Sequence, residues 1–253
     1  MNTNVDSSWE KVTSWYDKIV GADGHYFHQQ IILPNVLKLL DVNQKLSILD
    51  LACGQGILAR YLPKDAIYVG IDASASLIKA ASRYNKQKNH RFAVGDITCP
   101  LRLDLKKFTH GTLILALQNI GNPLAVLKNI HSHLIENGQL IIVINHPCFR
   151  IPRQSSWQID DAKKMQFRRI DRYLSPLEIP IQMHPSKQDL SPNTLSFHHP
   201  LSAYTSWLKE SGFIIEEIQE WCSDKISSGK YAKMENRSRQ EFPLFLAFIA
   251  KKI

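Results

Sequence analysis

Runs of apolar residues alternate with amphipathic segments along much of the chain. Five apolar runs have the length of a strand, at 46–52, 66–72, 90–96, 111–117 and 139–145. The segments between them place hydrophobic residues mostly at helical spacing. A strand that is apolar throughout is buried on both faces, as in a parallel sheet that helices cover on both sides. The pattern therefore predicts an α/β fold with a doubly wound, mainly parallel sheet.

Capping signals mark the ends of two predicted helices. Ser74 or Ser76 can cap the helix that follows the second apolar run. Another helix is predicted over 122–138, because Pro123 falls in its first turn and Gly138 stands just past its end.

The alternation stops after the fifth apolar run. The next residues are rich in proline, serine, histidine and aromatic side chains, and so long a stretch without a regular pattern predicts a lid or an inserted subdomain. A helix ending at Gly212, a strand over 213–221 and a final strand then complete the sheet, around a short polar insertion at 222–241. The predicted organisation is an N-terminal helical cover (1–35), a binding core (36–145), a lid insertion (146–199) and the C-terminal part of the core (200–253).

A turn with almost no side chains follows the first predicted strand. Asp50 lies near the end of the apolar run, and Ala52, Gly54 and Gly56 follow it at alternate positions. Glycine lets the backbone turn sharply and approach a ligand closely. Ligands of open parallel sheets bind beyond the carboxyl ends of the strands. The turn is therefore a candidate binding loop, although a tight strand-to-helix turn without a ligand would use the same residues.

Two further acids end the next two predicted strands. Asp72 stands 22 positions after Asp50, an offset at which a carboxylate can accept both hydroxyls of a ribose. Asp96 ends the third strand, where a turn cap is the alternative. The loop lacks the GxGxxG and GxxxxGK(S/T) patterns that hold phosphates. The sequence therefore favours a ligand with a ribose and without a phosphate.

Four motifs, in their order, resemble those of the class I S-adenosylmethionine-dependent methyltransferases: ILDLACGQG, VGIDAS, VGDI and LILALQNIGNP. Within that class the chain looks like the small-molecule group with a type 11 methyltransferase domain, over about residues 36–145. The resemblance implies a Rossmann-like sheet of seven strands. It also implies S-adenosyl-L-methionine as the cofactor and S-adenosyl-L-homocysteine as the product.

The resemblance also assigns cofactor contacts. The first loop would surround the methionine part, Asp72 would take the ribose hydroxyls, and Asp96 would meet the adenine amine. Alanine at position 52 departs from the glycine of many members. The implied cofactor-binding residues are Tyr16, Asp50, Ala52, Cys53, Gly54, Gln55, Gly56, Asp72, Ala73, Gly95, Asp96, Ile97, Leu117 and Gln118.

Methyl transfer does not require a fixed catalytic residue, because the sulfonium donor is already activated and the enzyme mainly aligns the reactants. A base is needed only where the acceptor must lose a proton. His146, directly after the fifth predicted strand, is the candidate base; a strand cap or a contact with the insertion is the alternative. The candidate acceptor contacts are Tyr26, His28, Asn119, Phe149 and Trp157, with packing or turn formation as alternatives.

Composition narrows the class of protein. Of the 253 residues, 44% are hydrophobic and 21% are charged, as in globular proteins, and no apolar run reaches the length of a membrane span. No secretory leader is visible and the four cysteines are far apart, so we expect a cytoplasmic protein with reduced thiols and no metal site. The net charge of +8 leaves RNA open as a partner, but scattered surface lysines explain it as well.

These observations predict a methyltransferase that acts on the oxygen or carbon of a small organic acceptor, as a monomer or homodimer. The alternatives are an RNA or protein methyltransferase and a cofactor-binding protein without turnover. The absence of a phosphate loop disfavours a nicotinamide-dependent dehydrogenase.

Overall fold

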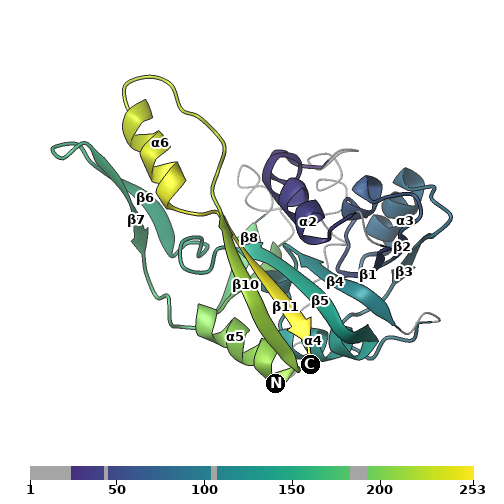
Figure 1. Cartoon of the computed structure of the whole chain (residues 1–253). Helices are drawn as coiled ribbons and strands as arrows, with labels where there is room; N and C mark the ends of the chain where they lie inside the picture. Colours follow the sequence, from purple (N-terminus) through teal and green to yellow (C-terminus); the bar gives the residue numbers. More distant parts are fainter. Residues whose placement is uncertain (1–23, 43–44, 104–106, 183–192) are drawn as a thin grey trace.

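A central sheet organises the molecule (Figure 1). The computed structural model describes residues 24–42, 45–103, 107–182 and 193–253. Within these residues seven strands form one sheet in the order β10-β11-β5-β4-β1-β2-β3, and only β11 runs against its neighbours. The predicted doubly wound, mainly parallel sheet is therefore confirmed. Its strands are β1 (Ser47–Leu51), β2 (Ile67–Asp72), β3 (His90–Val94), β4 (Phe108–Ile114), β5 (Leu134–Asn145), β10 (Phe213–Trp221) and β11 (Phe245–Lys252).

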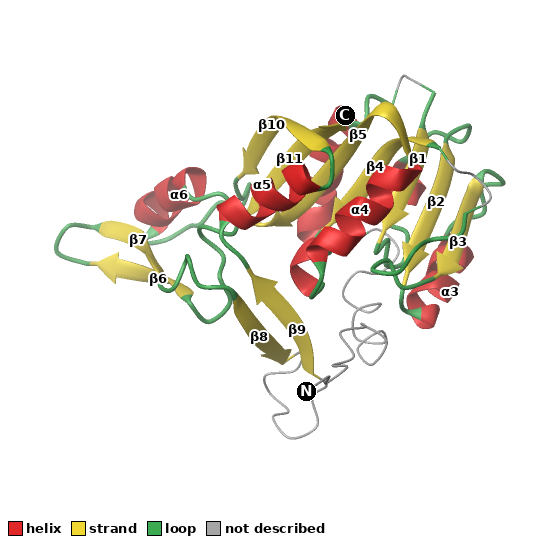
Figure 2. Cartoon of the chain, turned by 90° about the horizontal axis from the view of Figure 1, so that it is seen from below, coloured by secondary structure: helices red, strands yellow, loops and turns green. Residues whose placement is uncertain are grey.

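Helices cover both faces of this sheet (Figure 2). One cluster of buried side chains joins two helices, α4 and α5, to one face, and a second cluster joins the N-terminal helices to the other. Because both faces are covered, the middle strands consist of continuous apolar runs. The helices are η2 (His28–Ile32), α2 (Leu33–Leu39), η3 (Leu58–Tyr61), α3 (Ala75–Tyr84), η4 (Leu117–Asn119), α4 (Pro123–His133), α5 (Leu201–Glu210) and α6 (Ala232–Glu241).

Two of the predicted helix ends agree with the structure. The Ser74 hydroxyl accepts a hydrogen bond of 3.2 Å from the backbone N–H of Leu77, so Ser74 is the N-cap of α3. Gly212 follows α5 with a φ of +81°, the left-handed conformation that commonly ends a helix.

The predicted end of α4 is wrong. The helix stops at His133, and β5 begins at Leu134, which is fully buried and pairs with Phe108 of β4. An irregular register follows, and Gly138 lies inside the strand. Leu134 therefore belongs to the sheet and not to the helix, because its burial in the sheet outweighs the local helical pattern.

The insertion after β5 contains two antiparallel strand pairs, so it is not irregular, and its predicted role as a lid stays a prediction (Figure 2). Alternate residues of β7 are exposed, the period of a strand with one covered face. The hairpin strands are β6 (Ser155–Asp160), β7 (Met165–Ile170), β8 (Leu177–Gln182) and β9 (Asn193–His198).

The predicted polar insertion before β11 contains α6, which lies beside the β6–β7 hairpin (Figure 1). The Ser238 hydroxyl donates to the carbonyl oxygen of Gln166 at 3.1 Å, and the ring centroid of Trp157 lies 5.3 Å from that of Phe242. The two insertions thus pack on each other. The division of the chain into four segments stays a prediction, and no helix of the described residues is long and apolar enough to cross a membrane.

Candidate cofactor and acceptor sites

The loop after β1 has a tightly wound backbone. Ala52, Gly54 and Gly56 have φ angles of 54°, 55° and 68°. This left-handed region is open to glycine and disfavoured for alanine. A Cβ atom at position 56 would lie 2.7 Å from Cε1 of Phe92, so packing also requires glycine there. The loop therefore presents mainly backbone at the carboxyl end of β1.

Asp72 ties this loop to the end of β2. One carboxylate oxygen accepts the N–H of Gly54 at 2.8 Å, and the other accepts the N–H of Ser74 at 2.9 Å. The N–H of Gly95 bonds to the backbone carbonyl of Asp72 at 3.0 Å. The three sequence motifs thus form one connected unit at one edge of the sheet, as their spacing predicts.

Asp50 lies inside the sheet rather than in the loop. Its carboxylate accepts hydrogen bonds from the hydroxyls of Tyr68 at 2.5 Å and Thr112 at 2.7 Å, one on each neighbouring strand. The residue is 3% exposed, and burial raises the pKa of its carboxyl to about 6, against the effect of the two hydroxyls. Asp50 therefore links β1 to β2 and β4 beneath the loop.

The raised pKa of Asp50 makes stability depend on pH. The unfolded carboxyl ionises near its ordinary pKa of 3.8 and the folded one near 6, so ionisation destabilises the fold as pH rises through this window. Relative to Asp50→Asn, the unfolding free energy of the wild type is expected to fall by about 2 kcal/mol between pH 4 and pH 7. Urea denaturation of both proteins at the two pH values measures this difference. A difference independent of pH would contradict the buried, raised carboxyl.

Asp96 and its neighbours continue the same edge. The Asp96 carboxylate accepts the hydroxyl of Thr98 at 2.7 Å and its backbone N–H at 2.9 Å, and these bonds lower the pKa of Asp96. Ile97 is buried, whereas Ala73 is exposed. These residues lie at the ends of β2 and β3, and their contacts with adenine stay a prediction.

Two buried glutamines at this edge have side-chain amide atoms without a hydrogen-bond partner among the described residues. Gln55 is 1% exposed, and neither its amide oxygen nor its amide nitrogen is bonded in the structure. Gln118 donates to the Leu115 carbonyl at 2.9 Å, but its Oε1 has no partner. Buried amides of this kind are rare unless water or a ligand completes them. Asn119 also donates to the Leu115 carbonyl, at 3.3 Å, while Cys53 is half-buried and Leu117 fully buried.

His146 has both ring nitrogens engaged. Its Nδ1 accepts the N–H of Cys148 at 3.2 Å, so Nε2 carries the proton and lies 2.7 Å from a carboxylate oxygen of Glu220. The side chain is 3% exposed, and burial lowers the pKa of His146 despite Glu220. No ring nitrogen is left to take a proton from an acceptor, so the predicted role as a base has no support in this geometry and stays untested.

The other predicted acceptor contacts do not gather in one place. Phe149 and Trp157 both pack on Phe242, between the two insertions. The ring centroid of Phe242 lies 5.4 Å from that of Phe149 and 5.3 Å from that of Trp157. Tyr26 donates to Asp224 at 2.9 Å. Burial lowers the pKa of His28 to about 4, so this ring is neutral. Tyr16 lies outside the described residues.

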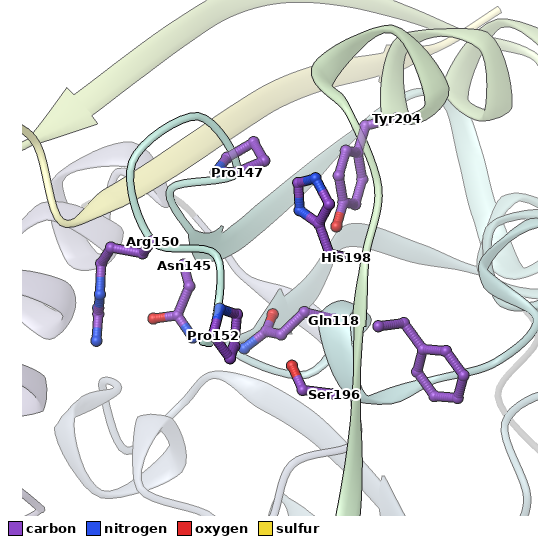
Figure 3. A pocket seen from close by; sticks show the side chains of 9 residues that line it. Gln118, Asn145, Pro147, Arg150, Pro152, Ser196, His198 and Tyr204 are labelled. Carbon is purple, nitrogen blue, oxygen red and sulfur yellow. The ribbon is translucent and has the colours of Figure 1, made fainter. Parts of the chain in front are cut away.

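A small pocket lies at the carboxyl ends of β4 and β5, beside β9 of the second hairpin (Figure 3). Its volume of about 20 Å³ accommodates a water-sized group. Gln118 is the one lining residue that the sequence singled out. The others, Asn145, Pro147, Arg150, Pro152, Ser196, Phe197, His198 and Tyr204, come mostly from the insertion.

His198 is the titratable group of this pocket that has a free ring nitrogen. Its Nε2 donates to the carbonyl oxygen of Tyr173 at 2.7 Å, which leaves Nδ1 without a proton. Burial lowers the pKa of His198, so the ring is neutral at pH 7. The adjacent Tyr204 is 3% exposed, and burial raises the pKa of its phenol. His198 can therefore accept a proton. The sequence did not indicate this role, because His198 lies far from the motifs along the chain.

The described residues contain no cluster of three or more histidine, cysteine or acidic side chains that could hold a metal ion. Their four cysteines are free.

Comparisons with known proteins agree with this geometry. A family model described as a methyltransferase domain matches residues 49–142. The ubiquinone biosynthesis O-methyltransferase of Rickettsia akari is 32% identical over 99 residues, which are 39% of each chain, so the match spans well under half of that relative. An S-adenosylmethionine-dependent methyltransferase of Mesorhizobium loti is 25% identical, with a TM-score of 0.67 over 87% of this chain and 96% of that one.

A third likeness concerns the cofactor product. The glycopeptide N-methyltransferase MtfA, solved with S-adenosyl-L-homocysteine, has a TM-score of 0.57 over 87% of each chain, at 14% identity. The family model and the Mesorhizobium loti structure confirm the predicted family and its cofactor, S-adenosyl-L-methionine. Residues 49–142 thus form a methyltransferase domain, and the chain has the fold of the class I S-adenosylmethionine-dependent methyltransferases.

Proposed function

We propose that the protein transfers a methyl group from S-adenosyl-L-methionine to a small organic acceptor, with oxygen as the favoured atom. The observation that carries this proposal is the adjacency of two features at one edge of the sheet. The loop of Gly54 and Gly56, tied to Asp72, lies at β1 and β2, and the polar pocket lies at β4 and β5. Gln118 belongs to the β4 loop and lines the pocket.

The described residues fit the cofactor. The glycines leave room for its methionine part, and Asp72 is a carboxylate at the strand end where a ribose would lie. The unpartnered Oε1 of Gln118 and the amide of Gln55 are buried groups that a polar ligand would complete. When bound, the cofactor supplies an activated methyl group. The predicted contacts of Cys53, Ala73, Gly95, Asp96, Ile97 and Leu117 remain part of this proposal.

We propose His198 as the group that takes the acceptor proton. A general base needs a free lone pair, a fixed orientation and a place beside the acceptor. His198 has the lone pair at Nδ1, and the Tyr173 carbonyl fixes the ring. Oxygen acceptors lose a proton on methylation, and the similarity to an O-methyltransferase supports this choice. His146, bonded to Glu220, is better placed to hold β5 to β10.

Calorimetry and a labelling screen test the function. Titration with S-adenosyl-L-methionine and S-adenosyl-L-homocysteine is expected to give micromolar affinities. Protein with methyl-labelled cofactor is then incubated with phenols, hydroxy acids, amines, RNA and protein extract. Label in organic-extractable products supports the proposal. Label that nuclease or protease releases would indicate an RNA or protein methyltransferase, and tight binding without any product would indicate a protein without turnover.

A further inference from the structure

One side chain that lines the pocket, Arg150, carries a charge that forms no ion pair with any described residue. Arg150 is half-buried, and its guanidinium donates only one long hydrogen bond, 3.4 Å to the carbonyl oxygen of Leu244. Its central carbon lies 5.2 Å from the ring centroid of Phe245. At least four of the five N–H donors of this guanidinium are therefore without a hydrogen bond in the described residues.

Among the residues that the structure describes, no acid forms an ion pair with this guanidinium. None of the ion pairs between described residues includes Arg150. No aspartate or glutamate lines the pocket, and the one charged group that shifts the pKa of Arg150 is a second cation, Arg168. Burial and Arg168 lower the pKa of Arg150 to about 10, so the guanidinium stays positive at neutral pH.

Arg168 makes a useful contrast. Its Nε donates to the carbonyl of Phe149 and another nitrogen donates to the Ser155 hydroxyl, both at 2.8 Å, and its guanidinium lies over the ring of Trp157. These bonds hold the β6–β7 hairpin to the segment after β5. Arg168 thus has a structural use, whereas Arg150 has little, although both are partly removed from water.

A half-buried cation that no acid among the described residues pairs with has lost part of its hydration without gaining an ion pair, which is a place where an anionic ligand would be stabilised. The planar fork of a guanidinium matches a carboxylate with two parallel hydrogen bonds. The amides of Asn145 and Gln118 and the hydroxyl of Ser196 add polar groups along the same wall. From this arrangement, and resting on the proposed function, we infer that Arg150 binds a carboxylate of the methyl acceptor. The acceptor is then a small organic acid.

The arrangement of the pocket also orients such an acid. Figure 3 shows Arg150 and His198 on different sides of the pocket, with Tyr204 beside His198. In this structure the space between the lining side chains holds only a water-sized group, so an acceptor that spans from Arg150 to His198 requires these side chains to move apart when it binds. A hydroxylated carboxylic acid suits both side chains, because the hydroxyl can donate its proton to the ring.

Binding measurements on protein saturated with S-adenosyl-L-homocysteine test the inference. The probes are benzoate, 4-hydroxybenzoate and hexanoate, with benzyl alcohol as the neutral probe and phenyl phosphate as the alternative anion. At least one carboxylate is expected to bind the wild type, at least tenfold more weakly to Arg150→Met, and with intermediate affinity to Arg150→Lys. Arg169→Met, which removes an exposed arginine paired with Asp171, is the matched control and should bind like the wild type.

Thermal unfolding without ligand supplies a second measurement. If Arg150 serves binding, Arg150→Met is expected to unfold at the same or a higher temperature, because an unpaired charge has been removed. The inference is overturned if Arg150→Met keeps the affinity for carboxylates, or if phenyl phosphate binds and the carboxylates do not. It also fails if the wild type binds S-adenosyl-L-homocysteine and none of the carboxylates. Failure to bind S-adenosyl-L-homocysteine itself would count against the proposed function instead.

Discussion

Asp72→Ala is expected to lower the affinity for S-adenosyl-L-methionine about 100-fold or more. Hydrogen bonds to a charged group contribute about 1.5–3 kcal/mol each, and a carboxylate that accepts two ribose hydroxyls provides two of them. A loss of about 3 kcal/mol corresponds to a factor of about 100 in affinity. Calorimetric titration with S-adenosyl-L-homocysteine gives the same comparison without turnover.

A structural effect of the same substitution has to be separated from the binding effect. Asp72 also accepts the N–H groups of Gly54 and Ser74, so the variant loosens the loop as well. Thermal unfolding of the free protein measures that contribution. Asp161→Ala, in the exposed turn between β6 and β7, is the control and should leave the affinity unchanged. An unchanged affinity in Asp72→Ala would contradict the assignment of the ribose to this strand end.

His198→Ala is expected to lower kcat about 10²- to 10³-fold toward a hydroxyl acceptor and to leave the affinity for S-adenosyl-L-homocysteine unchanged. Positioned bases contribute rate factors of this size. His133→Ala, at the end of α4 and outside the pocket, should retain full activity. Single-turnover kinetics at saturating cofactor measure the chemical step. Undiminished turnover in His198→Ala would rule out the role.

The pH dependence provides a further check on His198. Burial lowers its pKa below the ordinary value of 6.5, so the ring keeps its free lone pair at neutral pH and loses it only in acid. Activity of the wild type should therefore fall only in acid, at a pH below the ordinary histidine value of 6.5, and the residual activity of His198→Ala should lack this step. Nitrogen NMR of the ring is expected to show the tautomer protonated at Nε2.

The sequence predicts the sheet, and it also predicts that the loop after β1 and the end of β2 lie together, for a local reason; the cofactor contacts of these residues stay a prediction. The residues that shape this edge of the sheet stand within a few positions of a strand end. Asp50 and Gly54 belong to β1 and its loop, and Asp72 and Ser74 to β2 and its loop, so their closeness in the sequence is also closeness in the structure. The continuous apolar runs indicate parallel strands, and the carboxyl ends of parallel strands lie at the same edge of the sheet, where these groups therefore meet. Ser74 and Gly212 were predictable because caps are local as well.

The acceptor pocket could not be predicted, because long-range pairing builds it. Ser196 and His198 lie far along the chain from Gln118 and reach it only because β9 returns beside the β4 loop. The neutral, proton-accepting state of His198 depends on the Tyr173 carbonyl, which no local pattern reveals. Conversely, His146 lies directly after β5 as expected, but its Nε2 is hydrogen-bonded to the carboxylate of Glu220 in β10. The one signal in the sequence that points to this part of the structure is the strand period of β7, which would have predicted a hairpin in the insertion.

The contact of α6 with the β6–β7 hairpin has a consequence for exchanging acceptor specificity between relatives. Trp157 and Phe242, though distant in the sequence, cover each other, and Ser238 fastens the helix to Gln166. Transplanting either insertion alone would leave an aromatic face open to water and invite aggregation. Chimaeras that swap both insertions together should fold, so specificity in this architecture is inherited as a matched pair.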